Sequence, residues 1–235
     1  MSQYTQKAWE SYCKQHNLAF NVIDKLDHGV HHPKWMKSKL LEHNPDATNL
    51  LYVDSDTMPK WDAPNIFEQY TEGGLYAVED SCNLLWLYES VKAYSKALLD
   101  MEDPGRAFYG KYFNSGIMLF VGEQGRKILH KINQFYVDYS DALRSFNAEG
   151  KGMDQTPINL LVYTDVAGPN AQMMPYKWNM HSIVDTEVYK HNFQQQDNTR
   201  YFLKYGYFWH FNGMSIDQRH ASITALWQQH KDKYV

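Results

Sequence analysis

Apolar positions in the N-terminal part of the chain alternate between helical spacing and short continuous runs. Helical spacing predicts helices over 5–16, 33–43, 84–100 and 123–139, with a short helix near 63–70. Continuous apolar runs predict buried strands over 18–23, 49–53, 75–78 and 116–121. This alternation predicts an α/β fold with a mostly parallel sheet, and such sheets bind ligands at the carboxyl ends of their strands.

The C-terminal part of the chain has a less regular pattern. Apolar spacing predicts helices over 154–163 and 216–231, and polar composition predicts loops over 140–152 and 190–200. No internal repeat and no linker long enough to divide the chain stand out in the sequence. We therefore expect one domain over residues 1–235.

Composition and charge narrow the possible partners. Hydrophobic residues make up 43% of the chain and charged residues 21%, as in soluble globular proteins, and the formal net charge is -4. Such a charge gives no global basic field, so we expect no nucleic-acid partner. The sequence shows no signal-peptide core and no transmembrane segment, and Cys13 and Cys82 form no metal-spaced pair. These features predict a cytoplasmic protein.

The acidic triplet Asp54-Ser55-Asp56 directly follows the predicted strand 49–53. Two carboxylates two residues apart face one divalent cation if the chain turns there, and hard oxygen ligands suit Mg²⁺ or Mn²⁺. The alternative is a solvated acidic turn. The position directly after a buried strand favours the metal site.

The stretch HPKWMKSKLLEHNPDATNLLYVDSDTMP contains the acidic triplet and the segment that leads into it. Further short segments follow along the chain: YFNSGIML at 112–119, Met153-Asp154-Gln155 with Asn159, Trp178-Asn179, and HFNG at 210–213. In this order they resemble the motifs of GT-A glycosyltransferases, especially the retaining enzymes of family 8 and small viral or bacterial relatives, in which the first stretch leads into the DxD motif. Each segment alone is short, but their order along most of the chain is specific.

The resemblance implies a GT-A (Rossmann-like) fold, with a mixed, mostly parallel sheet flanked by helices. It implies transfer of a hexose from a nucleotide-diphosphate sugar, with UDP as the expected nucleotide, to a glycan or other hydroxyl acceptor with retention of configuration. Mn²⁺ or Mg²⁺ would be held by Asp54, Asp56 and His210. Gln155 and Asp154 are the implied catalytic residues. The implied donor-binding residues are Lys37, Asp54, Ser55, Asp80, Asn114, Ser115, Gly116 and Gly213.

Five of these residues have a structural alternative. Lys37 could lie on a solvated helix face, Asp80 and Asp154 could cap helices, Ser115 could form a turn, and His210 could be a packed histidine. From composition alone, a histidine is more often a packed residue than a metal ligand. The sequence context favours the functional role for His210 and leaves the two roles of Lys37 balanced.

The chain departs from the family in two places. GT-A domains usually begin with a strand that holds the nucleotide, and here the first predicted element is a helix, so the usual first strand is expected to be missing. Relatives also carry a lysine shortly after HFxG, for which Arg219, Lys204 or neither residue substitutes here. These departures keep open an inactive GT-A-like module that binds carbohydrate or a partner.

Two further enzymatic alternatives remain. A haloacid-dehalogenase-like phosphatase would continue its acidic motif with threonine where Met58 stands, which argues against it. An inverting GT-A enzyme would need a base, and Asp154 could serve. The expected location is the cytoplasm of a bacterium or of a virus-infected host cell.

Overall fold

The computed structural model describes residues 3–80, 83–100, 111–146, 152–164, 171–181 and 204–234. The chain divides into two compact units, which are described in turn. The first comprises 1–22, 53–69 and 175–235, and the second comprises 23–52 and 70–174. Both contain helices and mixed strands, so the predicted α/β class is confirmed. The expectation of a single domain stays a prediction.

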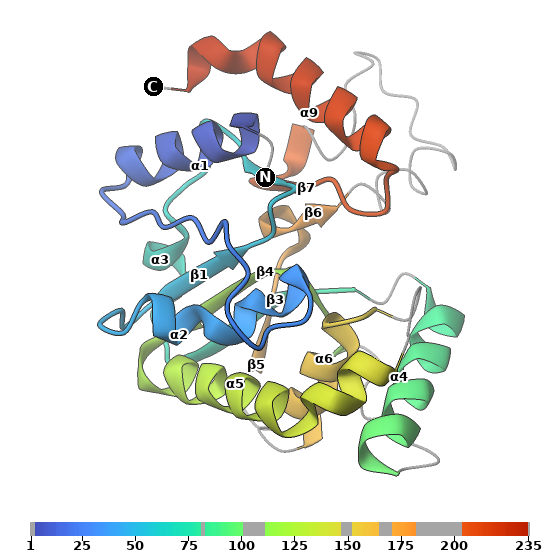
Figure 1. The fold of residues 1–235 in the computed structure, drawn as a ribbon. Helices are drawn as coiled ribbons and strands as arrows, with labels where there is room; N and C mark the ends of the chain where they lie inside the picture. Colours follow the sequence, from blue (N-terminus) through green and yellow to red (C-terminus); the bar gives the residue numbers. More distant parts are fainter. Residues whose placement is uncertain are drawn as a thin grey trace. The chain divides into compact units, whose positions relative to one another are not determined.

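The second unit is built on a four-stranded sheet with the order β1 (Leu50–Val53), β4 (Phe113–Val121), β3 (Gly74–Glu79) and β5 (Ala171–Met174). Strand β3 pairs with β4 antiparallel and with β5 parallel. Every residue of β4 is buried, because the strand lies between two other strands and under a helix. Its largely apolar sequence is compatible with this burial. That helix is α5 (Gly122–Ser145), which runs along the sheet (Figure 1).

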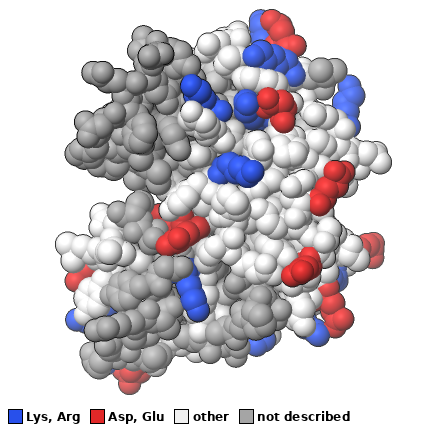
Figure 2. Space-filling view, turned by 180° about the vertical axis from the view of Figure 1, so that it is seen from behind, with Lys and Arg blue, Asp and Glu red and all other residues white. Residues whose placement is uncertain are grey.

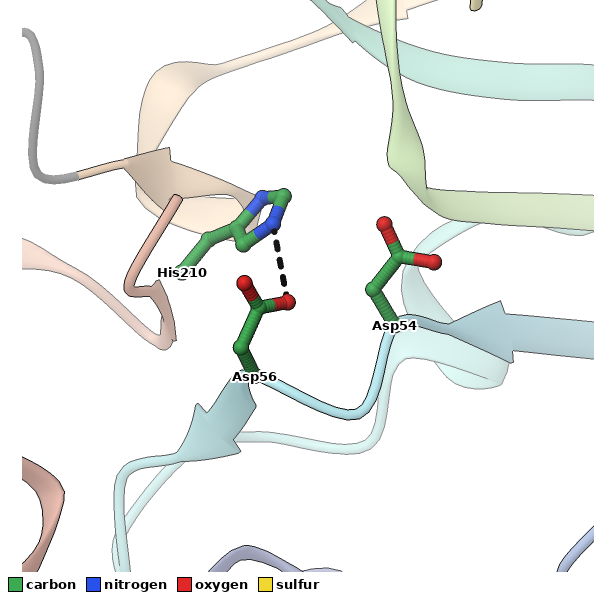
Figure 3. Close-up of side chains that lie close together, drawn as sticks. All are labelled: Asp54, Asp56 and His210. Carbon is green, nitrogen blue, oxygen red and sulfur yellow. Dashed lines mark ion pairs between the residues drawn. The ribbon is translucent and has the colours of Figure 1, made fainter. Parts of the chain in front are cut away.

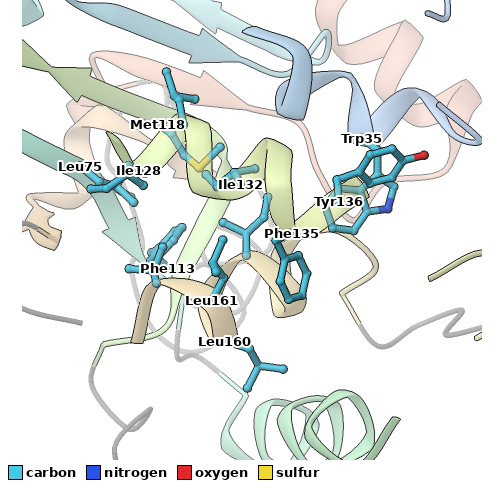
Figure 4. Packing of buried hydrophobic residues seen from close by; sticks show 14 of the residues in the cluster. Trp35, Leu75, Phe113, Met118, Ile128, Ile132, Phe135, Tyr136, Leu160 and Leu161 are labelled. Atoms are coloured by element: carbon cyan, nitrogen blue, oxygen red, sulfur yellow. The ribbon is translucent and has the colours of Figure 1, made fainter. Parts of the chain in front are cut away.

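The remaining helices of the second unit complete its core. They are η1 (Pro33–Lys39), which continues into α2 (Leu40–His43), then α4 (Leu84–Leu99) and α6 (Gln155–Thr164). Their apolar faces pack with α5 and the sheet around one buried cluster (Figure 4). The labelled members include Trp35, Leu75, Phe113, Met118 and Leu161. Burial of this apolar surface is the main force that holds these elements together.

A β-bulge interrupts the ladder between β3 and β4. Ala77 pairs with Met118, but the next residue, Val78, pairs with Asn114. The intervening residues 115–117 of β4 therefore have no partner residue on β3. Bulges of this kind redirect side chains and are frequent beside active sites.

The first unit holds a three-stranded sheet with the order β2 (Thr57–Pro59), β7 (Phe208–His210) and β6 (Met180–His181). β2 and β7 are antiparallel, and β6 and β7 are parallel. Helices α1 (Gln3–Gln15) and α9 (Ile216–His230) contact each other, and α1 also packs on β2 (Figure 1). The shorter elements are α3 (Ile66–Gln69), η3 (Tyr176–Trp178) and η4 (Lys231–Lys233). A second apolar cluster, which includes Met58, Trp209 and Leu226, forms the core of this unit.

Most predicted elements are confirmed within a few residues, and two predictions are wrong. No strand forms over 18–23, where Ala19 is exposed and the other apolar residues are only partly buried. Residues 140–145 belong to α5 rather than to a loop, because buried Leu143 extends the apolar face of that helix. The short strands β2, β5, β6 and β7 were not predicted. The predicted loop 190–200 lies outside the described residues.

The described surface carries charges of both signs. Acidic and basic side chains are interspersed on the face shown in Figure 2, and the described residues there form no extended patch of one sign. Among the described residues, no helix is both long and apolar enough to cross a membrane.

Candidate functional site

A tight turn at residues 54–57 carries the acidic triplet. The Thr57 amide and hydroxyl both donate to the Asp54 carbonyl, at 3.1 and 2.7 Å. From α1, the Thr5 hydroxyl donates to the Ser55 carbonyl at 3.0 Å, and Trp9 Nε1 donates to the Thr57 carbonyl at 3.1 Å. Helix α1 therefore fixes the backbone of the turn from which both carboxylates project.

Strand pairing brings His210 to the same turn. His210 pairs with Thr57 in the β2–β7 ladder, and the Phe211 amide donates to the Asp56 carbonyl at 2.9 Å. Side-chain ligand atoms of Asp54, Asp56 and His210 all lie within 4.8 Å of one another. Figure 3 shows the three side chains converging from the end of β1, the turn and the end of β7.

Hydrogen bonds and charges orient this cluster. His210 is buried, its Nδ1 lies 3.1 Å from Asn179 Oδ1, and its Nε2 lies 3.3 Å from Asp56 Oδ1. Arg219 Nη1 lies 3.0 Å from the other carboxylate oxygen of Asp56. Burial would raise the pKa of the Asp56 carboxyl, but the hydrogen bond and charge of His210 and the charge of Arg219 outweigh it and lower the pKa to about 2.

The chemistry of these three side chains fits a divalent cation. Two carboxylates supply hard oxygen ligands, and an imidazole favours Mn²⁺ over Mg²⁺. When His210 Nδ1 donates to Asn179, the Nε2 lone pair remains for the cation, an arrangement common among metal-binding histidines. Gly213, three residues after His210, has a φ of 69°, a conformation that glycine adopts without strain.

In the second unit, a buried ion pair joins η1 to the start of α6. Lys37 Nζ lies 2.6 Å from Asp154 Oδ2, and their side chains are only 1% and 6% exposed. The Ser115 hydroxyl donates to the same carboxylate oxygen at 2.8 Å. Lys37 also donates to the Ser115 carbonyl at 3.0 Å. Lys37, Ser115 and Asp154 therefore form a closed, buried triad.

Gln155 extends this triad towards the end of β3. Its Oε1 accepts from the Ser115 amide at 3.1 Å, and its Nε2 donates to Asp80 Oδ2 at 3.0 Å. Asn114 Nδ2 donates to the same oxygen of Asp80 at 3.1 Å, and Asn114 Oδ1 accepts from the Gly116 amide at 2.9 Å. The bulge in β4 thus places Asn114, Ser115 and Gly116 in one polar network with Asp80 and Gln155.

The turn before α6 is tightly packed. Gly152 has a φ of 82°, and a Cβ there would lie 2.5 Å from the Thr156 hydroxyl oxygen and 3.0 Å from the Tyr112 hydroxyl oxygen. Asn159 binds both the amide and the carbonyl of Phe113, each at 2.9 Å. Burial is the largest cause that raises the pKa of Tyr112. These contacts fix the start of α6, and with it Asp154 and Gln155.

The structure therefore gathers the predicted residues into two groups, one in each unit. The first contains Asp54, Asp56 and His210, with Ser55 in the same turn and Gly213 nearby in sequence. The second contains Lys37, Asp80, Asn114, Ser115, Gly116, Asp154 and Gln155.

Two of the structural alternatives are wrong. Lys37 is buried rather than solvated. The N-cap of α4 is Asn83 rather than Asp80. Asp154 directly precedes α6, so its capping alternative stays open, and its side chain binds Lys37 and Ser115.

Two residues were not predicted in their structural roles. Asn179 orients His210, and the Trp178-Asn179 pair was the sequence signal that pointed to this segment. Arg219 pairs with a predicted metal ligand, Asp56. Its position on α9 could not identify this partner without the fold.

Comparisons with known proteins address the fold. No protein-family model matches the chain. No curated protein matches it. Among solved structures, the chain is similar to a glycosyltransferase involved in glycosylation of the major capsid of PBCV-1. The TM-score is 0.53 and the identity 15%, over 95% of this chain and 91% of that one.

Two other similar structures have lower scores. One is the galactosyltransferase LgtC in complex with donor and acceptor sugar analogs, with a TM-score of 0.45 and 14% identity over 94% of this chain and 76% of that one. The other is mouse xyloside xylosyltransferase 1, with a TM-score of 0.40 and 14% identity over 89% and 72%. Because these scores are low, the fold assignment depends on the first structure. The chain has the GT-A fold of that glycosyltransferase.

Proposed function

We propose that this chain is a metal-dependent glycosyltransferase that moves a hexose from a nucleotide-diphosphate sugar, with UDP as the expected nucleotide, to a hydroxyl acceptor. The observation that carries the proposal is the convergence of Asp54, Asp56 and His210 in a chain with the GT-A fold. Separate segments, 54–56 and 210, supply these ligands, so a solvated acidic turn does not account for the cluster.

In this proposal, Asp54, Asp56 and His210 hold Mn²⁺ or Mg²⁺. The cation would bind the diphosphate and stabilise the negative charge that develops on it as it leaves. Asn179 keeps the His210 ring oriented, and α1 keeps both aspartates on one turn. Such preorganisation lowers the reorganisation needed when the cation and the diphosphate bind.

The network in the second unit supplies groups suited to a sugar. Gln155 Oε1 accepts one hydrogen bond from the Ser115 amide, and a carbonyl oxygen has a second lone pair. We assign that lone pair to the oxocarbenium-like transition state, which a fixed dipole stabilises. Asp80, Asn114 and the backbone of the bulge are proposed to bind sugar hydroxyls, and Ser55 and Gly213 to approach the donor through their backbone.

The surroundings of Asp154 support retention over inversion. An inverting enzyme needs a protein base, and Asp154 would have to leave a buried ion pair with Lys37 at 2.6 Å to accept a proton. In the proposed retaining reaction, the bond from the anomeric carbon to the diphosphate breaks and a bond to the acceptor oxygen forms on the same face. The acceptor proton passes to the leaving diphosphate, and no base from the protein is required.

A calorimetric titration of UDP tests the metal site first. UDP should bind in the presence of Mn²⁺ and lose most of its affinity in EDTA. Asp56→Ala should abolish the metal dependence, whereas Asp62→Ala should not, because Asp62 is an exposed acid of the same segment that pairs with Lys60. Equal UDP affinity with and without metal would contradict the metal-dependent proposal.

Turnover decides between the transferase and an inactive binding module. Hydrolysis or transfer should be measured over a panel of UDP-sugars with Mn²⁺, and the anomeric configuration of the product should be read by NMR. Slow hydrolysis of one UDP-sugar with retained configuration is the expected result. Binding of UDP-sugars without any turnover across the panel and with diverse acceptors would favour the inactive module.

A further inference from the structure

Lys37 is the most deeply buried charged side chain of the polar network. Its residue is 1% exposed, and its ammonium lies 2.6 Å from the Asp154 carboxylate. A buried ammonium is tolerated only where partners compensate for its lost hydration. The ion pair must therefore form as the second unit folds, and it is a fixed part of the network.

The partners of the ammonium account for its hydrogen-bonding capacity. A lysine ammonium has three N–H donors. Lys37 Nζ contacts Asp154, the Ser115 carbonyl at 3.0 Å and the Ser115 hydroxyl at 3.2 Å, and it lies 4.7 Å from the centre of the Tyr52 ring. A direct contact with a donor substrate would require one of these buried interactions to break.

Ser115 forms hydrogen bonds with both Lys37 and Gln155 and so couples the positions of their side chains. The Ser115 carbonyl accepts from Lys37, while the Ser115 amide donates to Gln155 Oε1 at 3.1 Å. The opposite end of the Gln155 amide is held by Asp80 at 3.0 Å. Residues 115–117 have no partner residue on β3, so on that side these side-chain bonds help to hold the bulge.

We propose that Lys37 is a positioning residue: it contacts no substrate, and it holds Ser115 and Asp154 so that the Gln155 carbonyl keeps one orientation. This inference rests on the proposed transferase function, and it replaces the direct donor contact that the family resemblance implies. A positioning role and a direct contact differ in the kinetic constant that they affect.

The test compares Lys37→Met and Lys37→Arg with Lys39→Met. Lys39 lies on the same element, η1, is partly buried and pairs with the exposed Glu42, so its replacement controls for loss of a lysine from this element. Both Lys37 variants should lower kcat by about 10-fold or more, because a small displacement of a catalytic group is costly. UDP affinity with Mn²⁺ and the donor KM should change less than about 2-fold. Lys39→Met should leave all three values unchanged.

A spectroscopic measurement separates positioning from a purely structural role. The side-chain amide signals of Gln155, assigned by their disappearance in Gln155→Ala, should shift in Lys37→Arg and stay in place in Lys39→Met. A higher donor KM with unchanged kcat would overturn the proposal in favour of direct contact. Unchanged kcat and unchanged Gln155 signals, with only a lower Tm, would also overturn it.

The amide measurement does not depend on activity. If the wild-type protein neither binds UDP nor turns over any UDP-sugar, the proposed function fails, while the Gln155 signals still show whether Lys37 controls the orientation of that side chain. If Lys37→Met does not fold, the kinetic constants and the Gln155 amide signals are both measured on Lys37→Arg, which keeps the charge. This variant still tests the proposal, because the planar guanidinium cannot reproduce the ammonium contacts.

Discussion

Replacement of Arg219 is expected to strengthen metal binding rather than weaken it. Arg219 Nη1 lies 3.0 Å from Asp56 Oδ2, so the guanidinium neutralises a carboxylate that the proposed cation needs. Arg219 Nη2 donates to the Met214 carbonyl at 3.3 Å, and Nε has no hydrogen-bond partner among the described residues. In Arg219→Gln, Asp56 loses a positive charge that competes with the cation.

The size of the effect follows from the exposure of the pair. The side chain of Arg219 is 34% exposed and that of Asp56 is 13% exposed. An ion pair with this access to water contributes about 0.5–1 kcal/mol. Because about 1.4 kcal/mol corresponds to a tenfold change in affinity, the Kd for Mn²⁺ should fall about 2- to 5-fold in Arg219→Gln. Higher salt should reduce the difference.

The assay is a titration of Mn²⁺ into nucleotide-free protein, followed by the electron paramagnetic resonance signal of free Mn²⁺. Arg219→Lys keeps the charge and should stay near the wild-type affinity. Lys231→Gln removes a positive charge directly after the same helix and controls for the general change in net charge. A Kd for Mn²⁺ in Arg219→Gln that is unchanged or higher would refute the idea that Arg219 competes for Asp56.

Three further predictions concern pH, catalysis and packing. The pKa of Asp56 falls from 3.8 to about 2 on folding, so the metal-free protein gains about 2 kcal/mol of stability that is fully present above pH 4 and is lost as the pH falls towards 2. Asp56→Asn should flatten this part of the pH profile of urea unfolding, and an unchanged profile would contradict the assignment. Gln155→Ala should leave UDP binding with Mn²⁺ intact by calorimetry and lower kcat by about 100-fold, and a proportional loss of binding would count against a role confined to the transition state. Gly152→Ala should lower the free energy of unfolding by about 1–3 kcal/mol, because it combines a positive φ with a clash against Thr156. Gly29→Ala, at a φ of 87° with open space around it, should lower the free energy of unfolding by less. Equal losses in the two variants would show that the clash at Gly152 does not contribute.

The two aspartates of the proposed metal site were predictable because they directly follow a strand that can be recognised in the sequence. Leu50–Val53 is a short apolar run that ends at Asp54, so a strand and its carboxyl end could be located from local pattern alone. His210 lies far from the aspartates in sequence and came only from the family-like HFNG context. Strand pairing between β2 and β7 then explains the contact, and neither three-residue strand has enough periodicity to be predicted.

Periodicity fails where tertiary contacts set the structure. Residues 18–23 have the apolar composition of a strand, but no strand forms there, because a strand needs a partner that composition cannot supply. In the bulge of β4, Ser115 accepts a hydrogen bond from Lys37 and donates one to Gln155, which lie 78 and 40 residues away from it. Long-range bonds of this kind leave no local pattern.

The α/β class, most helices and the identity of the metal-ligand candidates followed from apolar periodicity and motif order, since both are properties of short segments. The burial of Lys37, the pairing of Arg219 with Asp56 and the orientation of His210 by Asn179 required the folded chain. A charged side chain in a sequence is equally compatible with water, a ligand or a buried partner. Only the three-dimensional packing determines which of these surrounds it, because the cost of burying a charge depends on the neighbours that the fold brings to it.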